Sequence, residues 1–267
     1  MAARQRGARP ATPRPSGQHL LRSDAIAQEL VDDAALADAV VLEIGAGTGR
    51  LTEALGRAAR SVIAVELDPV FAEGLRHRFH HHRTISVREA DILSVALPLV
   101  PYRAFGNVPF SATTAILRRL LDDPSAPLLG ADLIVQFEAA RKRAAAWPTN
   151  LASLGWMPWW EFALVRHLPR TAFEPAPSVD AAVLSIRRRR RPLLPAGDRG
   201  AYLEMLRVAF HRSNLPIRRS LGGRIPTRGW KRLARERGID PNVTAPDLDV
   251  FGWTALFTLI RGVPHDL

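Results

Sequence analysis

The sequence predicts an α/β protein, with a Rossmann-like parallel sheet followed by a small all-helical C-terminal region. Three observations lead to this prediction. Short apolar segments alternate with helix-like segments in the first part of the chain, which is typical of a parallel sheet covered on both faces. A glycine-rich turn, residues 45–49, follows the first strong apolar segment. After residue 187 no strand pattern remains, and the segments read as helices.

The elements follow in order along the chain. Residues 1–16 hold four arginines, three prolines and no acid, which predicts a disordered basic arm. Ser23 or Asp24 is suited to cap a first helix that runs to about Val31. The expected strands are Val40–Ile44, Ser61–Val65, Ile85–Val87, Arg103–Phe105, Leu133–Phe137, Leu164–Leu168 and Ala181–Arg187. The remaining helices are expected at Arg50–Arg57, Pro69–Phe79, Ala112–Leu121, Ala201–Phe210, Trp230–Arg237 and Phe251–Leu259. The last two strands have no helix between them, so we expect an antiparallel pair at the sheet edge.

Charge is distributed unevenly along the chain, whose formal net charge is +11. Residues 1–186 carry 20 basic and 19 acidic side chains, whereas residues 187–267 carry 17 and 7. A nearly neutral body joined to a basic segment indicates binding of a large anion, most commonly nucleic acid. The alternative is a basic surface that only keeps the protein in solution.

Composition excludes several classes of protein. The chain has no cysteine, which excludes disulfides, thiolate metal sites and cysteine nucleophiles. No apolar run reaches the ~18–20 residues of a membrane span, and Met1–Gly17 has no apolar core of a secretory signal. We therefore expect a cytoplasmic protein without a membrane partner. His80, His81 and His82 predict a solvated loop and no metal site, because three adjacent side chains cannot converge on one ion without strain.

The glycine turn lies in the segment Glu43-Ile44-Gly45-Ala46-Gly47-Thr48-Gly49. Its third glycine comes one position too early for the dinucleotide fingerprint, and no P-loop Gly-Lys-Ser/Thr follows. The pattern instead resembles motif I of the S-adenosylmethionine-dependent methyltransferases. Gly45, Gly47 and Gly49 are the predicted cofactor-binding residues, and a turn without ligand is the alternative.

Two carboxylates follow the next two expected strands. Glu66 ends the second strand, 21 residues after Gly45, where a doubly wound fold places a carboxylate for the ribose hydroxyls. Asp91 lies just after the third strand, where it could accept a hydrogen bond from an adenine amine while Ile92 packs on the ring. Solvated strand ends are the alternative for each acid by itself.

Asn107-Val108-Pro109-Phe110, after the fourth expected strand, is the most specific signal in the chain. It resembles motif IV of the amino-methyltransferases. The lone pair of an exocyclic adenine amine is delocalised into the ring, so two acceptors are needed to hold its N–H groups and aim the nitrogen. The Asn107 side-chain carbonyl and the Val108 backbone carbonyl could do this. Pro109 fixes the backbone direction, and Phe110 offers a stacking face to a splayed-out base.

These segments, in this order, resemble the ribosomal RNA adenine N6-dimethyltransferase family, and within it the erythromycin-resistance (Erm) methyltransferases of 23S rRNA. The segments that carry the resemblance are Ser16–Leu21, Glu43–Gly49, Glu66, Ala90-Asp91, Gly106–Phe110 with Thr113-Thr114, and Pro169–Ala182. The resemblance implies a class I methyltransferase sheet over residues 17–188 and a helical, basic RNA-binding domain over residues 189–267. It also implies S-adenosylmethionine as cofactor and a monomer that methylates one adenine in the peptidyl-transferase loop of 23S rRNA, with macrolide, lincosamide and streptogramin resistance as the consequence.

The resemblance further implies roles for single residues. His19, Leu21, Gly45, Glu66, Asp91 and Asn107 take cofactor-binding positions. Phe173 resembles the second aromatic that sandwiches the target base, with a core phenylalanine as the alternative. One departure concerns the segment Gln18-His19-Leu20, which in the family usually reads Gln-Asn-Phe. A backbone contact to the cofactor would survive this change, and a side-chain amide contact would not.

Basic residues outside these motifs are expected to contact RNA phosphates. They are Arg141, Lys142 and Arg143 after the fifth strand, and Arg187 and Arg188 at the start of the arginine run. Plain solvation is the alternative for the first three. Three alternatives remain open. A 16S rRNA dimethyltransferase would show Asn-Leu-Pro-Tyr, whereas Phe110 and residues 136–143 favour the Erm branch. The intact motif at 107–110 argues against a non-catalytic binder, and the PRTAF segment at 169–173 against a DNA adenine methyltransferase.

Overall fold

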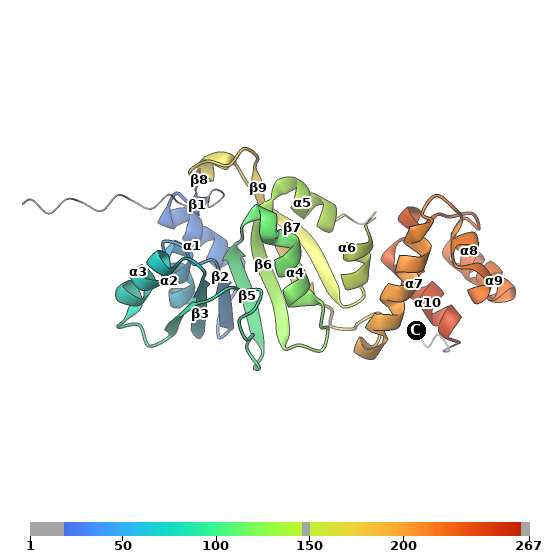
Figure 1. Cartoon of the computed structure of the whole chain (residues 1–267), viewed down its shortest axis with the longest axis horizontal. Coiled ribbons are helices and arrows are strands. Elements are labelled where there is room, and N and C mark those ends of the chain that lie inside the picture. The colour runs from blue at the N-terminus through green and yellow to red at the C-terminus, as the bar shows by residue number, and fades with distance from the viewer. Residues whose placement is uncertain (1–18, 146–149, 263–267) are drawn as a thin grey trace, which may run out of the picture.

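Seven strands form one sheet at the centre of the molecule (Figure 1). The computed structural model describes residues 19–145 and 150–262, so the predicted arm at 1–16 lies outside the described residues. The strand order is β4-β3-β2-β5-β6-β9-β7. The first five are parallel, and β9 runs antiparallel to both β6 and β7. A predicted antiparallel pair at the edge is therefore confirmed.

The strand boundaries agree closely with the sequence prediction, with two exceptions. The strands of the sheet are β2 (Val40–Ile44), β3 (Ser61–Glu66), β4 (Ile85–Glu89), β5 (Tyr102–Asn107), β6 (Leu128–Gln136), β7 (Trp160–Leu168) and β9 (Ala181–Arg188). The exceptions are β6 and β7, which begin five and four residues earlier than expected. The added part of β6 contains a charged residue, Asp132. Its carboxylate is held inside the sheet by Arg103 at 2.6 Å and Arg187 at 2.8 Å, so a charge can lie in mid-strand.

Helices cover both faces of the sheet. On one face lie α1 (Asp24–Asp33), α2 (Arg50–Ala58) and α3 (Pro69–Phe79), and on the other α4 (Thr113–Leu121), α5 (Phe137–Arg143) and α6 (Leu151–Trp156). Strand β2 shows why both are needed, because all five of its residues are buried. Leu42 packs into the core under α4, whereas Val41 packs into the core under α1 and α2. Alternate residues of one apolar strand thus pack into two separate cores.

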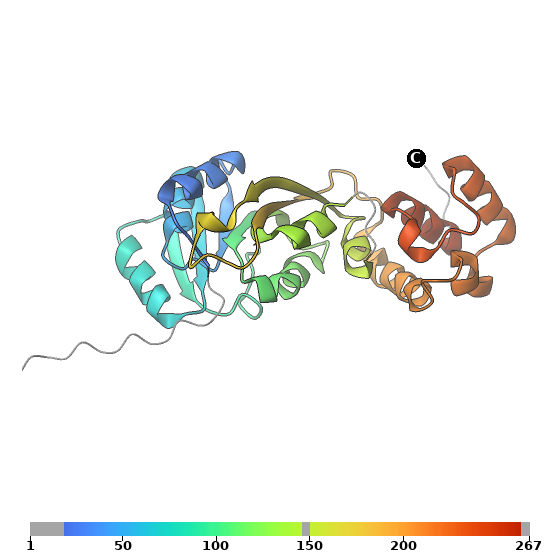
Figure 2. The same ribbon diagram turned by 90° about the horizontal axis from the view of Figure 1, so that it is seen from above.

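The C-terminal region contains only helices among its described residues. They are α7 (Arg199–His211), α8 (Ile217–Ser220), α9 (Thr227–Arg237) and α10 (Val250–Arg261). This bundle lies at one end of the long axis of the molecule, beyond α6, in both views (Figures 1 and 2). Trp159 joins it to the sheet: its indole nitrogen donates to the Leu194 carbonyl at 2.8 Å, and its ring lies 6.2 Å from that of Tyr202 on α7.

The sequence did not predict several short elements. These are α5, α6, α8 and a two-stranded sheet of β1 (Leu20–Leu21) and β8 (Phe173–Glu174). Segments of two to seven residues carry too few positions for a helical or strand period to show. None of the described helices is long and apolar enough to span a membrane. In the same described ranges, no group of three or more His, Asp or Glu side chains is arranged to hold a metal ion.

Candidate active site

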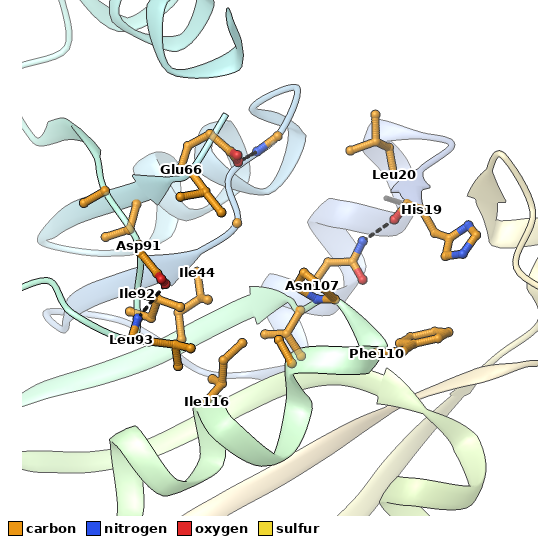
Figure 3. Close-up of a pocket in the computed structure, with 18 residues that line it drawn as sticks. His19, Leu20, Ile44, Glu66, Asp91, Ile92, Leu93, Asn107, Phe110 and Ile116 are labelled. Atoms are coloured by element: carbon orange, nitrogen blue, oxygen red, sulfur yellow. Dashed lines mark hydrogen bonds between the residues drawn. The ribbon is translucent and has the colours of Figure 1, made fainter. Parts of the chain in front are cut away.

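A cavity of about 270 Å³ opens where β2, β3, β4 and β5 end (Figure 3). This is the edge of the sheet at which ligands bind in open α/β folds. Predicted and unpredicted residues line it together. The predicted lining residues are His19, Gly45, Gly47, Glu66, Asp91, Ile92, Asn107, Val108, Pro109 and Phe110, and the unpredicted ones are Leu20, Ile44, Val65, Leu67, Ala90, Leu93, Ala112 and Ile116. All of the unpredicted residues are apolar. In the sequence they are indistinguishable from core residues.

The glycine loop is shaped by positive φ angles, 72° at Gly45 and 52° at Gly47, which other residues rarely adopt. The Gly47 amide donates to Glu66 Oε2 at 2.7 Å, so the loop is tied to the end of β3. Gly49 is a correction. It does not line the cavity but begins α2, where an added Cβ would lie 2.7 Å from the Leu75 side chain. Its role is close packing of α2 against α3.

Glu66 and Asp91 are held by backbone amides in front of the cavity. Glu66 Oε1 accepts from the Asp68 amide at 2.9 Å, so each oxygen of this carboxylate already has one partner. A carboxylate oxygen can accept more than one hydrogen bond, so both remain open to hydroxyl donors. Asp91 Oδ1 accepts from the Leu93 amide at 2.9 Å, and its Oδ2 accepts from no residue that the structure describes. The two acids thus offer acceptors from neighbouring strand ends.

Asn107 has a defined amide orientation. Its Nδ2 donates to the backbone carbonyl of His19 at 2.6 Å, so its Oδ1 is the group left as an acceptor (Figure 3). The partner carbonyl lies in the segment before β1, which brings His19 and Leu20 to the cavity. The prediction for Leu21 is wrong. Its side chain is buried in the core under α1, and its neighbour Leu20 lines the cavity instead.

The turn after β5 is held by contacts within the motif and to the neighbouring strand. The Val108 amide donates to the Ile134 carbonyl of β6 at 3.3 Å, and the hydroxyl of Thr113 donates to the Phe110 carbonyl at 3.0 Å. Thr113 is 7% exposed, and the sequence signals for it were its place in a segment that carries the family resemblance and its position at the start of the next helix. The turn presents Phe110 at the mouth of the cavity beside His19.

Glu43, in β2 behind the glycine loop, is fully buried. Neither carboxyl oxygen accepts a hydrogen bond from a residue that the structure describes. Burial raises the pKa of Glu43 to about 8; the neighbouring Thr52 hydroxyl opposes this effect and the charge of Glu66 adds to it. Glu43 is therefore neutral at pH 7, while the negative charge at this edge of the sheet is carried by Glu66 and Asp91.

Phe173 is a second correction. Its ring is 0% exposed and packs with Leu21 and Phe105 in the core under α1. It is absent from the cavity lining and has no open face for a base. Its partner in the small β1–β8 sheet is Leu21, which explains the burial. The alternative of a core phenylalanine is the correct one here.

Arg187 and Arg188 do not face the cavity either. Strand β9 begins opposite Gln136, at the cavity edge of the sheet, and reaches Arg187 opposite Gly130, at the other edge. Arg187 pairs with Asp132, as described above. The guanidinium of Arg188 donates to the carbonyls of Leu128, Pro124 and Ala126 and lies 4.6 Å from the Trp160 ring. Both guanidinium groups thus donate to groups of the protein itself, and their phosphate contacts stay predictions.

The three basic residues predicted on the segment that forms α5 lie in different surroundings. Arg143 turns inward, donating to Asn150 Oδ1 at 2.9 Å and Ser153 Oγ at 3.0 Å, and is excluded from the predicted RNA contacts. Arg141 is exposed and pairs with Glu138 at 2.7 Å, whereas the exposed Lys142 makes no ion pair with a described residue. Because α5 follows β6, this cluster lies at the cavity edge of the sheet.

Comparison with known proteins identifies the family of the chain. Residues 14–261 match the family model described as ribosomal RNA adenine dimethylase. The chain is 37% identical over 223 residues to the mycinamicin-resistance protein MyrB of Micromonospora griseorubida, covering 84% of this chain and 70% of that protein. It is 30% identical over 256 residues to an rRNA adenine N-6-methyltransferase of Bacillus licheniformis, covering 95% and 89% of the two chains. The crystal structure of the 23S rRNA methyltransferase ErmE superimposes with a TM-score of 0.80 at 30% identity, covering 91% of this chain and 99% of that one. The chain therefore belongs to the ribosomal RNA adenine dimethylase family.

Proposed function

We propose that this protein transfers one or two methyl groups from S-adenosylmethionine to N6 of an adenine in the peptidyl-transferase loop of 23S rRNA, and so confers macrolide, lincosamide and streptogramin resistance. The observation that carries the proposal is the orientation of Asn107. With its Nδ2 engaged by the His19 carbonyl, its Oδ1 is free as an acceptor in a cavity that also holds Glu66 and Asp91. The likeness to MyrB and to ErmE supports the choice of 23S rRNA and the link to resistance.

S-adenosylmethionine is the cofactor of this family, and the residues present suit it. Its adenosine part needs acceptors for two ribose hydroxyls and an adenine amine, with apolar groups against the base. Glu66 offers the first pair of acceptors and Asp91 the third, and Ile92 with Ile44 and Ile116 supplies apolar surface. When bound, the cofactor supplies a methyl group on a positively charged sulfur.

The protein's own part in the reaction is to hold the nucleophile. Asn107 Oδ1 and the Val108 carbonyl accept the two N–H groups of the target amine and turn its lone pair toward the methyl group. Phe110 stacks on the base once it has been splayed out of the RNA. Thr113 keeps the turn in shape through its bond to the Phe110 carbonyl. Catalysis is thus mainly positioning.

The C-terminal helices supply the electrostatic part of RNA binding in this proposal. Residues 217–237 carry eight exposed arginine or lysine side chains and a single acid, Glu236. They lie on α8, on α9 and, for Arg224, in the short 3-10 helix between them, at the end of the molecule furthest from β3 (Figures 1 and 2). A basic surface so far from the cavity suits a substrate much larger than one loop. We propose residues 17–188 as the catalytic unit and 189–267 as this RNA-binding unit, acting as a cytoplasmic monomer.

The test uses purified protein, tritium-labelled S-adenosylmethionine, and separate unmodified 23S and 16S rRNA, with primer extension to locate the modified base. Label on 23S rRNA with a stop in the peptidyl-transferase loop is expected. Label on 16S rRNA would instead assign the protein to the 16S branch of the family, with the same catalytic residues. Label on neither would contradict the proposed activity, and light scattering of the same sample tests the monomer.

A further inference from the structure

His19 stands where the family usually has asparagine, and its ring lies at the mouth of the active site. The ring centroid is 5.9 Å from that of Phe110, with 38° between the planes. Both side chains line the cavity, and Asn107 lies beside the space between them (Figure 3). The side chain of His19 is therefore a wall of the region into which a target base must enter.

The orientation of the imidazole is fixed from outside the cavity. His19 Nδ1 lies 2.8 Å from the Pro175 carbonyl, which can only accept a hydrogen bond, so Nδ1 carries the proton. The other ring nitrogen, Nε2, has no partner among the residues that the structure describes. His19 is thus a planar, partly exposed ring with a free face, held by its backbone carbonyl at one end and by Nδ1 at the other.

Phe173 cannot form the second face of a base sandwich here, because its ring is 0% exposed. Given the proposed function, the geometry points to His19 as the residue that takes this place, so that the target adenine is held between the rings of Phe110 and His19 with N6 toward Asn107. A base stacked on both rings needs about 7 Å between them, twice the ~3.5 Å optimum for carbon contacts. The observed 5.9 Å therefore requires only a small outward rotation of a partly exposed side chain.

This role differs from that of the His19 backbone. The bond from Asn107 uses the carbonyl of His19, which every substitution retains. Removal of the ring should therefore leave the cofactor site and the Asn107 amide in place and weaken only the hold on the base. An aromatic replacement should keep most of that hold, since stacking is tolerant of ring chemistry.

The experiment is a cycle of protein and RNA changes. The RNA is a 23S rRNA fragment that contains the peptidyl-transferase loop, either with the target adenine or with an abasic site at that position. Dissociation constants are measured for wild type, His19→Ala, His19→Phe and Phe110→Ala, in the presence of S-adenosylhomocysteine so that no turnover occurs. His81→Ala, in the exposed loop after α3, is the matched control. Circular dichroism and cofactor binding report on folding.

The expected result is about a tenfold preference of wild type for the adenine RNA, largely lost in His19→Ala and in Phe110→Ala, and kept in His19→Phe and His81→Ala. Methylation activity should change in the same variants as the binding preference, with a raised KM for RNA in His19→Ala. A preference retained in full by His19→Ala, while Phe110→Ala loses it, would overturn this inference and leave the proposed function standing. A wild type that binds both RNAs equally would overturn the sandwich, and methylation of the adenine RNA by the same protein then tests the proposed function separately. A His19→Ala variant with weakened cofactor binding would assign His19 to the cofactor site and so overturn the sandwich.

Discussion

The cofactor side and the RNA side of this protein are built from residues that are fixed in different ways. On the cofactor side, Glu66 and Asp91 lie at the ends of neighbouring parallel strands and are held by amides two residues away or by the glycine loop. On the RNA side, Arg187 pairs with Asp132, 55 residues away in the sequence, and Arg188 donates to the Pro124 carbonyl, 64 residues away. A strand-end acid therefore lies where the local pattern predicts, whereas the role of an arginine depends on which acids and carbonyls the fold brings to it.

The sharpest test of the cofactor side is Asn107→Ala. Loss of the acceptor that holds the amine should lower methyl transfer by at least about 10²-fold, comparable to removal of one oxyanion-hole donor. RNA affinity should stay within about twofold, because the phosphate contacts lie elsewhere. Single-turnover kinetics with filter binding measures both quantities. Retained turnover would refute the role of Asn107.

Glu43→Gln tests whether the buried carboxyl group behind the glycine loop is neutral. Its pKa is 4.5 in the unfolded reference and about 8 in the fold, so the folded protein binds one proton more between these values. Stability is then lost as the pH rises through this window. Relative to Glu43→Gln, wild type should lose about 2–3 kcal/mol of unfolding free energy between about pH 5.5 and pH 7.5. Urea unfolding at both pH values measures it, and parallel curves for the two proteins would show that Glu43 is ionised.

Arg188→Ala tests whether an arginine predicted to bind RNA is structural. Its removal leaves the carbonyls of Leu128, Pro124 and Ala126 without their donor and uncovers Trp160. We expect a loss of about 2 kcal/mol in unfolding free energy and an unchanged salt dependence of RNA binding. Thermal unfolding and binding at several salt concentrations separate the two effects. A variant that is as stable as wild type but shows a reduced salt slope would instead support a phosphate contact for Arg188.

Lys142→Ala is the counterpart of Arg188→Ala at an exposed side chain that was also predicted to contact RNA. We expect it to have the smallest effect. Lys142 is exposed and makes no ion pair with a described residue, so stability should change by less than about 0.5 kcal/mol. If it contacts a phosphate, RNA affinity should fall slightly for every sequence and the slope of log K against log salt should drop by about one. An unchanged slope would make this lysine a solvated surface charge.

Much of the fold was predictable from local pattern. Val40–Ile44 and Pro69–Phe79 have the predicted boundaries, because an apolar run before glycines and a proline behind a capping aspartate are complete signals in themselves. Strand β6 was found only in part, since the burial of Asp132 depends on arginines from β5 and β9. Elements such as β1 exist only because β8 lies beside them.

The sequence by itself determined the chemistry of the cofactor edge: the glycine loop, the two strand-end acids and the Asn107 motif with Phe110, each of which follows directly after an apolar strand segment. The contact from the Asn107 amide to the His19 carbonyl, 88 residues away, came from the tertiary structure. Only the tertiary structure decided that Leu20 and not Leu21 faces the cavity, that Phe173 is buried, and that Arg143, Arg187 and Arg188 serve the interior. It also decided that Glu43 is neutral and that His19 lies beside Phe110. The physical reason is the same in each case. A side chain's neighbours at long sequence separation set its burial and its partners, and no local pattern carries that information.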